Sequence, residues 1–403
     1  MANLLAIDTG GTFTDFFLIT PQGIHTHKVL STPQDPSQAI LKGIRELGED
    51  RAGEIIHGST VATNAFLERK GARVGLITTA GFEDVIEIGR QNRPHLYDFN
   101  TSRTPNLVAK NHRWGLGERV NARGKVQQAL NPKELRSLVQ KIKNSPVESL
   151  AVVLLFSYAN DGHEKKTGAA LKKLGIPVSL SSDICREYRE YERSSTTCIN
   201  AYVAPIMSRY LGRLKKKLGH QVRIMQSNGG VLSIDEASHE SVRTLLSGPA
   251  GGALGAQRIA KQAGIDKVMT LDMGGTSSDV TLIAGDIELT SEAVVGAYPI
   301  KSPMIHIHTI GAGGGSIAQR DAGGALQVGP QSAGADPGPI CYGRGGRQIT
   351  ITDAHLWLGR LDAEHFLGGT MSLQTQRLAP AFKRLSKQLK LSPDETAAGI
   401  IEV

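Results

Sequence analysis

The chain of 403 residues is poor in cysteine and lacks long apolar runs. Its three cysteines, Cys185, Cys198 and Cys341, form no CxxC pair, which argues against a zinc knuckle and against a disulfide framework. No run approaches the ~18 apolar residues that cross a membrane. The apolar N-terminal stretch is interrupted by Asp8 and has no basic residues before it, so it predicts a strand rather than a signal peptide. We therefore expect a protein of the reducing cytoplasm with no membrane partner.

Basic charge is not concentrated in any one segment, although the formal net charge is +8. The densest basic cluster, residues 215–217, ends a helical pattern, where cations complement the helix dipole. We therefore expect no nucleic-acid partner. Glycine, in contrast, is abundant: 46 residues, many of them in segments such as DMGGTSSD and GAGGGS. Because glycine lets the backbone approach a ligand closely, this pattern favours a ligand-binding enzyme, with tight turns as the alternative.

Strand and helix patterns alternate from residue 50 to about 182, which is typical of an α/β sheet. The segment SLAVVLLFSY predicts a central strand, and Asn131 with Glu134 predicts a capping box at the start of a helix. The polar, aperiodic stretch from Gly89 to Arg123 predicts a long excursion. A change of pattern at 183–200, which leads into a long helix, predicts the boundary between two domains, 1–182 and 183–403.

Two segments share the pattern D-x-G-G-T-x-x-D: DTGGTFTD at 8–15 and DMGGTSSD at 272–279. Each lies between apolar segments that predict strands. One copy alone is equally well explained as a glycine hairpin. Two copies in the same strand-turn-strand context indicate an internal duplication, which we expect to place both loops at one cleft.

The residue types in these loops suit phosphate groups and a divalent cation. Consecutive backbone amides can form an anion-binding nest, and hydroxyl groups add hydrogen-bond donors. The carboxylates of Asp8 and Asp272 are the candidate catalytic groups and the candidate ligands of Mg²⁺, either directly or through water. The residues predicted to contact the nucleotide are Gly10, Gly11, Thr12, Thr14, Gly274, Gly275, Thr276, Gly313 and Gly314, with Ser277 as a further hydroxyl donor.

The loop GAGGGS at 311–316 differs from the better-known phosphate motifs. The chain has no GxxxxGK[ST], and GAGGGS lacks the acidic residue of a dinucleotide-binding fold. We interpret it as another close-approach loop at the same cleft, with a plain turn as the alternative. His306 and His308, just before it, are predicted to share one face of a strand. Because no third ligand is visible, packed or cleft-lining histidines are favoured over a metal site.

The duplicated loops resemble the two phosphate hairpins of the actin, sugar-kinase and Hsp70 superfamily, which implies duplicated ribonuclease H-like α/β domains around a nucleotide cleft. The chain more closely resembles the HyuA-type subunit of the hydantoinase, N-methylhydantoinase and 5-oxoprolinase family. The matching segments, in family order, are HGSTVATNAFLERKGARVGLITTAGFEDVIEIGRQNRP, EYREYERSSTTCINAYVAP, QSNGG, LLSGPAGG, DMGGTSSDV, HTIGAGGGSIA and VGPQSAGADPGPICYGRGG.

This resemblance implies a subunit that binds ATP and Mg²⁺ and phosphorylates the carbonyl oxygen of a small cyclic amide or imide of the hydantoin or 5-oxoproline type. A HyuB-type partner can then help water to open the ring. Such a subunit mainly aligns and neutralises the transferred phosphoryl group. ATP-dependent carboxylases of acetone and acetophenone use related subunits, so that function stays open, as does an inactive or regulatory remnant. The resemblance also places His57 and Asn64 on the substrate side, with a structural role for His57 as the alternative.

The sequence departs from the family pattern at three places. His306 stands where the family usually has an acidic residue, and Asn121 stands where it tends to have aspartate. No G-G-A-G-P-like adenosine loop follows residue 360. We therefore expect the second domain, 183–403, to be C-terminally truncated, to expose apolar surface, and to bind ATP weakly or not at all when isolated.

Overall fold

The computed structural model describes residues 3–10, 13–32, 35–48, 53–92, 105–275, 278–321, 323–334, 336–366, 369 and 371–403. Their contacts divide the chain into two compact units, which are described separately below. Unit 1 comprises Met1–Gly251 and Glu288–Ile305, and unit 2 comprises Gly252–Ile287 and His306–Val403. The domain boundary that the sequence predicts near 183–200 is a different division of the chain and stays a prediction.

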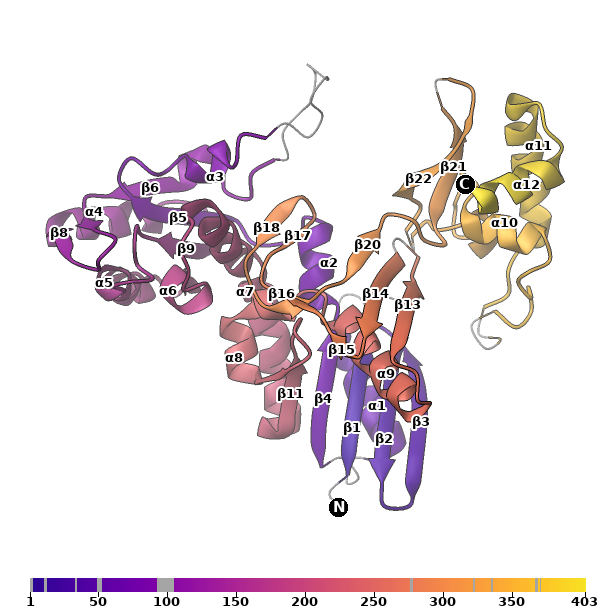
Figure 1. Ribbon diagram of the computed structural model, residues 1–403, viewed down its shortest axis with the longest axis horizontal. Helices are drawn as coiled ribbons and strands as arrows, with labels where there is room; N and C mark the ends of the chain where they lie inside the picture. Colours follow the sequence, from indigo (N-terminus) through magenta and orange to yellow (C-terminus); the bar gives the residue numbers. More distant parts are fainter. Residues whose placement is uncertain are drawn as a thin grey trace. The chain divides into compact units, whose positions relative to one another are not determined.

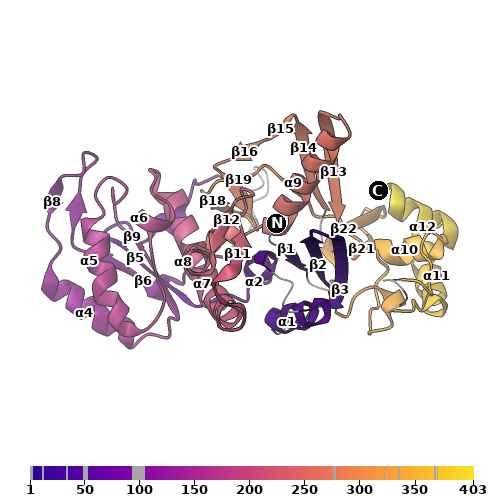
Figure 2. The same cartoon turned by 90° about the horizontal axis from the view of Figure 1, so that it is seen from below.

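Unit 1 contains a six-stranded sheet. Its strands are β1 (Leu4–Thr9), β2 (Phe13–Thr20), β3 (Gly23–Leu30), β4 (Glu54–Ser59), β11 (Val222–Met225) and β12 (Val231–Ser233). Their order is β12-β11-β4-β1-β2-β3 (Figure 1). The predicted N-terminal strand-turn-strand is β1–β2, and β1 pairs in parallel with β4 on its other side. Figure 2 shows β1, β2 and β3 side by side, with helix α1 (Pro36–Leu47) along one face.

A second sheet in unit 1 is parallel throughout, in the order β10-β9-β5-β6. Its strands are β5 (Val74–Thr79), β6 (Arg113–Leu116), β9 (Ser149–Val153) and β10 (Val178–Leu180). Every residue of β9 is buried, as the apolar run predicts for a central strand. Strand β6 corrects the expectation of an aperiodic excursion. The sequence pattern does not indicate this strand because it begins with a charged residue. Arg113 is nevertheless buried, since its guanidinium bonds to Asp84, Glu87 and the Val108 carbonyl.

Short strands and helices complete unit 1. The strands are β7 (Arg119–Val120), β8 (Val126–Gln128), β16 (Leu289–Thr290), β17 (Ala293–Val295), β18 (Tyr298–Ile300) and β19 (Met304–Ile305). The helices are α2 (Val61–Leu67), α3 (Val85–Ile88), α4 (Pro132–Lys143), α5 (Gly162–Leu171), α6 (Ser181–Ile184), α7 (Glu190–Leu218) and α8 (Ile234–His239). No helix within the described ranges is both long and apolar enough to cross a membrane.

The capping box predicted at α4 forms only in part. The Asn131 side chain accepts a hydrogen bond from the Lys133 amide, as an N-cap residue does. Glu134, however, accepts from the Gly117 amide at 2.8 Å, which ties α4 to the loop after β6. A tertiary hydrogen bond has therefore replaced the local one that the sequence predicts.

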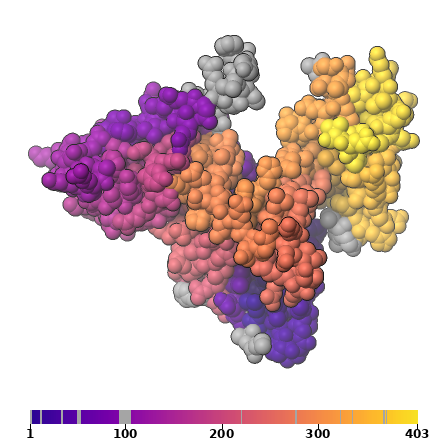
Figure 3. All heavy atoms as spheres, in the orientation of Figure 1, coloured from indigo at the N-terminus to yellow at the C-terminus, as the bar shows by residue number. Residues whose placement is uncertain are grey.

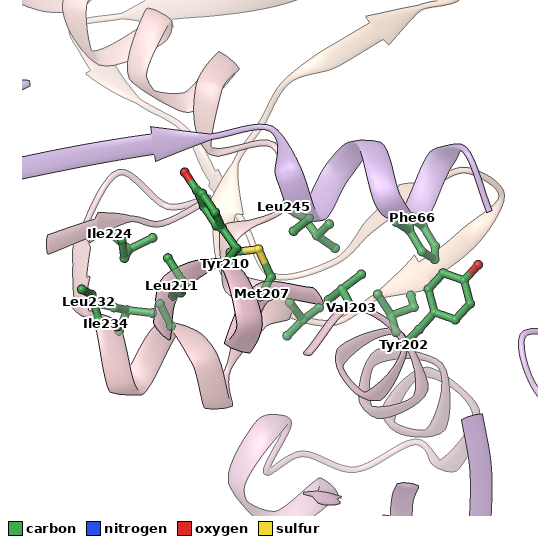
Figure 4. Close-up of a cluster of buried hydrophobic side chains, with 14 of the residues drawn as sticks. Phe66, Tyr202, Val203, Met207, Tyr210, Leu211, Ile224, Leu232, Ile234 and Leu245 are labelled. Atoms are coloured by element: carbon green, nitrogen blue, oxygen red, sulfur yellow. The ribbon is translucent and has the colours of Figure 1, made fainter. Parts of the chain in front are cut away.

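Helix α7 is the centre of the hydrophobic core of unit 1. Figure 4 shows its side chains packed against α2, β11 and α8, with Phe66 beside Tyr202. The hydroxyl of Tyr210 points toward β4, the strand that runs into α2 (Figure 4). There it bonds to the imidazole of His57. The long helix predicted after residue 183 is confirmed as α7, which packs on β5, β9 and β10 of the second sheet and bonds to β4 through Tyr210.

Unit 2 is built from the second D-x-G-G-T hairpin, a β-ribbon and a small helical cluster. Its elements are α9 (Ser247–Gln262, whose first turn belongs to unit 1), β13 (Lys267–Met273), β14 (Ser278–Ala284), β15 (Asp286–Ile287), β20 (His308–Ile310), β21 (Ser316–Arg320), β22 (Leu326–Ser332), α10 (Ile351–Trp357), α11 (Leu378–Leu389) and α12 (Pro393–Glu402). Helices α10–α12 enclose a separate core around Phe382, and their atoms form the yellow cluster of Figure 3.

One face of the β13–β14 pair exposes apolar side chains. Met269, Leu271 and Leu282 are each about 70% exposed. The equivalent positions of the first hairpin, counted from the repeated motif, are Leu5, Ile7 and Leu18, which are at most 2% exposed because α1 and α7 belong to the same core. The sequence-based expectation of exposed apolar surface is met at this face, and the two copies of the repeat therefore differ in what covers them.

Candidate functional site

The two D-x-G-G-T-x-x-D segments adopt the same strand register. Asp8 lies opposite Asp15 across β1–β2, and Asp272 lies opposite Asp279 across β13–β14. In both hairpins the two aspartates share one face of the sheet, since side chains at directly paired positions point the same way. The spacing of the motif therefore produces a carboxylate pair beside each glycine turn.

Several polar groups of the first loop hold the loop itself. The Gly10 amide donates to the Phe13 carbonyl at 2.9 Å, and the Gly10 carbonyl accepts from the Ser31 hydroxyl at 2.8 Å. The Thr14 side chain is fully buried and bonds to the same Ser31 hydroxyl. Gly10 and Thr14 thus have a structural role here, and their contact with a nucleotide stays a prediction. Gly11 and Thr12 lie outside the described residues.

The two carboxylates of the first hairpin differ in their surroundings. Asp15 forms an ion pair with Lys28 at 2.6 Å. Asp8 is exposed and lies beside Gly58 of the parallel strand β4. A Cβ atom at position 58 would lie only 3.2 Å from Asp8 Oδ1, so the glycine leaves room for this carboxylate. Asp8 is therefore exposed to solvent beside a strand that leaves room for its carboxylate, whereas the half-exposed Asp15 is bonded to Lys28.

The GAGGGS loop packs directly on the second hairpin. The Gly314 amide donates to the Gly274 carbonyl at 3.0 Å, and the Gly315 amide donates to the Gly275 carbonyl at 2.7 Å. A Cβ atom at position 315 would lie 2.8 Å from the Gly275 oxygen, so only glycine fits there without a shift. The GAGGGS loop therefore packs backbone against backbone on the second hairpin, and its predicted close approach to a ligand stays a prediction.

These contacts also show how the other predicted residues of the loop are used. The Gly313 amide donates to the Ser316 hydroxyl at 2.9 Å, so the amides of both Gly313 and Gly314 hold protein atoms. Their contact with a nucleotide stays a prediction. Gly274 and Gly275 lie at the exposed end of the hairpin. Thr276 and Ser277 lie outside the described residues.

The two carboxylates of the second hairpin, Asp272 and Asp279, repel each other. Partial burial raises the pKa of Asp279, a hydrogen bond from the Thr309 hydroxyl opposes that change, and the neighbouring Asp272 charge raises the pKa further. A divalent cation at the exposed Asp272 would relieve this repulsion. Within the described ranges no group of three or more His, Cys, Asp or Glu side chains could hold a metal alone. The exposed Asp272 beside Asp279 is the kind of carboxylate site that Mg²⁺ uses, because this ion commonly combines one or two carboxylates with phosphate oxygens; its binding here stays a prediction.

The histidines singled out in the sequence have different places. His57 is 1% exposed, bonds through Nδ1 to the Ile7 carbonyl and through Nε2 to Tyr210, and has its pKa lowered to about 4 by burial. His57 thus has a structural role here, and a contact with substrate stays a prediction. His308 starts β20, whereas His306 precedes that strand, so the expected i, i+2 pair on one strand does not form.

Two asparagines have local roles. Asn64 donates through its side-chain nitrogen to the Thr60 hydroxyl at 3.3 Å. Asn121 accepts from the Arg123 and Lys125 amides at 3.0 Å, which builds the turn between β7 and β8. An aspartate would accept the same two bonds, so the departure from the family pattern at this position preserves the turn.

Sequence reasoning missed a pocket of about 300 Å³ in unit 1, between α3 and the first turn of α7. Its lining comes from residues 82–90 and 189–192, which are about a hundred positions apart in the chain. Both halves of the lining lie in segments that carry the family resemblance, GFEDVIEIGRQNRP and EYREYER, but neither segment by itself indicates a pocket.

Comparison with known proteins bears on these features. The profile described as Hydantoinase/oxoprolinase N-terminal region matches residues 4–175, and the one described as Hydantoinase/oxoprolinase matches residues 193–403. The chain is 38% identical to the caprolactamase subunit alpha of Pseudomonas jessenii, covering 98% of this chain and 60% of that protein.

Two solved structures are similar over 99% of this chain and 61% of their own chains. The crystal structure of the ATP-dependent caprolactamase from Pseudomonas jessenii gives a TM-score of 0.80 at 36% identity. The nucleotide-free structure of acetone carboxylase gives a TM-score of 0.85 at 30% identity.

The chain therefore spans about 60% of the length of these relatives. The α/β fold class predicted from the sequence is confirmed by both structures. The two profiles match nearly the whole chain, in the order that the sequence motifs predict. The chain belongs to the hydantoinase/oxoprolinase family.

Proposed function

We propose that this chain is the ATP-binding subunit of an ATP-dependent hydrolase that activates a small cyclic amide or imide for ring opening. The observation that supports this most is the identical register of its two D-x-G-G-T hairpins, each with a paired carboxylate beside a glycine turn. The similarity to caprolactamase subunit alpha supports the same class of substrate.

In this proposal Asp8 and Asp272 contact Mg²⁺ or its bound water, and the glycine turns bind phosphate oxygens. The ion would supply positive charge that aligns and neutralises the γ-phosphoryl group. The GAGGGS loop holds the second turn in place, because the amides of Gly314 and Gly315 donate hydrogen bonds to its carbonyl groups. Asp279, bonded to Thr309, keeps negative charge next to Asp272.

The chemical need for ATP follows from the stability of the amide. The lactam oxygen attacks the γ-phosphorus, and the bond from that phosphorus to ADP breaks. Water then adds to the activated carbon, the C–N bond breaks as the nitrogen gains a proton, and hydrolysis of the acyl phosphate releases phosphate and carboxylate. The main requirement on the protein is to position the reacting atoms and stabilise their charge.

The remaining assignments complete the proposal. A HyuB-type partner subunit would supply the groups that activate water, and the naming of a similar protein as a subunit supports the need for a partner. We propose a cytoplasmic enzyme with family domains at 1–182 and 183–403, the second of which carries the second phosphate loop.

An ATP-dependent ketone carboxylase is the second candidate, because acetone carboxylase is structurally similar with a TM-score of 0.85. The two functions are separated by assaying ADP release from the protein purified with its native partner. We expect release with five- to seven-membered lactams and equal amounts of ring-opened product. Release that instead requires a ketone together with bicarbonate would select the carboxylase and reject the hydrolase.

A further inference from the structure

The pocket between α3 and α7 has a mixed lining. Phe82, Val85 and Ile88 form an apolar wall, and α3 packs against the start of α7. Its volume of about 300 Å³ is at the lower end for ligand sites, which suits one small ring. The pocket lies wholly within unit 1, on elements other than those that carry the D-x-G-G-T loop.

The charged groups of the pocket are balanced in sign. Arg90 bonds through its guanidinium to Glu192, whose side chain is only 8% exposed. Arg189 pairs with Glu292 at 2.9 Å outside the lining, and Glu190 adds a further carboxylate at the rim. Two arginines and two glutamates line the pocket, so it offers hydrogen-bond donors and acceptors without net attraction for an anion.

The backbone around this pocket adopts conformations that cost energy. Arg189 has φ +72° and Gln91 has φ +57°, although neither is glycine. Gly89 has φ +57°, and a Cβ atom there would lie 3.3 Å from the Tyr191 ring. Strained residues concentrate at ligand sites when the surrounding structure fixes them. Gly89 and Gln91 belong to one segment and Arg189 to another about a hundred positions away, and the pocket brings these two segments together.

We propose that this pocket binds the organic substrate, and that it selects an uncharged cyclic amide over a ring that carries a carboxylate. The methylenes of the ring pack on Phe82, Val85 and Ile88, a guanidinium donates to the amide oxygen, and a glutamate accepts from the amide N–H. A carboxylated ring is disfavoured because Glu190 and Glu192 already offset both arginines, and Glu292 adds negative charge beside Arg189. This inference rests on the proposed function, whose substrate it narrows.

Two variants test the pocket without removing either group of the Arg90–Glu192 ion pair. Ile88→Trp fills the cavity from a side chain that is 47% exposed. Arg189→Gly removes the guanidinium and also relaxes the positive φ, so the melting temperature should not fall. Ile24→Trp is the matched control, because Ile24 is 61% exposed on β3 and does not line the pocket.

Binding is measured by saturation-transfer NMR on the full chain without ATP, with 2-piperidone as the neutral probe and 5-oxoproline as the carboxylated one. We expect 2-piperidone to bind at least about tenfold more tightly than 5-oxoproline. Ile88→Trp and Arg189→Gly should each weaken it by about tenfold or more, and Ile24→Trp should leave it unchanged.

Unchanged lactam affinity in both pocket variants, or no binding of 2-piperidone to the wild-type chain, would overturn the assignment of this pocket. Tighter binding of 5-oxoproline would overturn the selectivity for an uncharged ring. These results are independent of turnover. If the pocket binds lactam but the purified protein releases no ADP with any lactam, the proposed function fails while the binding site stands.

Discussion

Asp272 lies directly opposite Asp279 across the β13–β14 pair, in the register in which Asp8 lies opposite Asp15 in the other unit. In the first pair Asp15 is bonded to the ammonium group of Lys28, whereas in the second pair Asp279 accepts a hydrogen bond from the neutral hydroxyl of Thr309. The second pair thus keeps more of its negative charge for a cation. The surroundings of Asp272, Asp8 and Asp15 lead to the expectations that follow.

Replacing Asp272 with asparagine should lower ATP-dependent turnover by about 100-fold or more and raise the Mg²⁺ concentration required, because a ligand for the aligned phosphate is lost. Asp8→Asn should behave in the same way. Steady-state rates measured over a magnesium titration test both variants.

Asp15→Asn is the matched control for those two variants. It removes an exposed ion pair with Lys28, so turnover should stay within about threefold of wild type. Near-normal rates for Asp272→Asn would show that its carboxylate does not serve the reaction.

Equivalent positions of the repeat should respond differently to the same truncation. Ile7→Ala removes buried methyl groups and should cost about 2–5 kcal/mol of unfolding free energy. Leu271→Ala, at a position that is 68% exposed, should cost less than about 0.5 kcal/mol. Urea unfolding followed by tryptophan fluorescence can report on each unit, because Trp114 lies in unit 1 and Trp357 in unit 2. One tryptophan at a time is replaced with phenylalanine, so that the signal comes from a single unit. Equal losses at the two positions would mean that the exposed face is covered in solution.

Mild acid should destabilise unit 1 through His57. Burial lowers the pKa of His57 from 6.5 to about 4, so the unfolded chain takes up this proton first as the pH falls. The stabilising contribution is complete above pH 6.5 and is lost progressively down to pH 4, on the order of 3 kcal/mol in total. Unfolding followed by Trp114 at pH 7.5, 5.5 and 4.5 measures this loss. His57→Gln should flatten the profile, and an equally steep profile in that variant would assign the effect to other groups.

Gly315→Ala should disrupt the contact between the GAGGGS loop and the second hairpin. The added methyl group would lie 2.8 Å from both the Gly275 carbonyl and the Ser332 hydroxyl, which should cost about 1–3 kcal/mol in unit 2. Gly311→Ala is the control, because its nearest neighbour would be 3.9 Å away. Unfolding followed by Trp357 compares them, and equal stability of the two variants would contradict the close approach.

Local features could be predicted from the sequence, and features that depend on distant residues could not. The hairpins at 8–15 and 272–279 were predictable because strand-turn-strand patterning is local. The use of the Gly314 amide was not predictable, since its acceptor, Gly274, is forty positions away. Strand β6 was missed because Arg113, a charged residue, is buried by its partners on α3 and at Val108.

The candidate site shows the same limit. The carboxylates were named from the repeated motif, but the burial of Thr14 and its bond to Ser31 require the packing of β2 on β3. His57 could not be assigned from sequence, because its partner Tyr210 comes from α7. The pocket combines the backbone of Gly89 with the first turn of α7, and no single segment carries its pattern.

The central claim, that ATP activates a cyclic amide in this protein, is tested most directly by the coupling of two products. The protein purified with its native partner is incubated with ATP, Mg²⁺ and a neutral lactam, and both ADP and the ring-opened amino acid are counted. We predict one ADP for each ring opened, with both products lost together in Asp272→Asn. Ring opening without ATP, or ADP release that does not depend on lactam, would contradict the account.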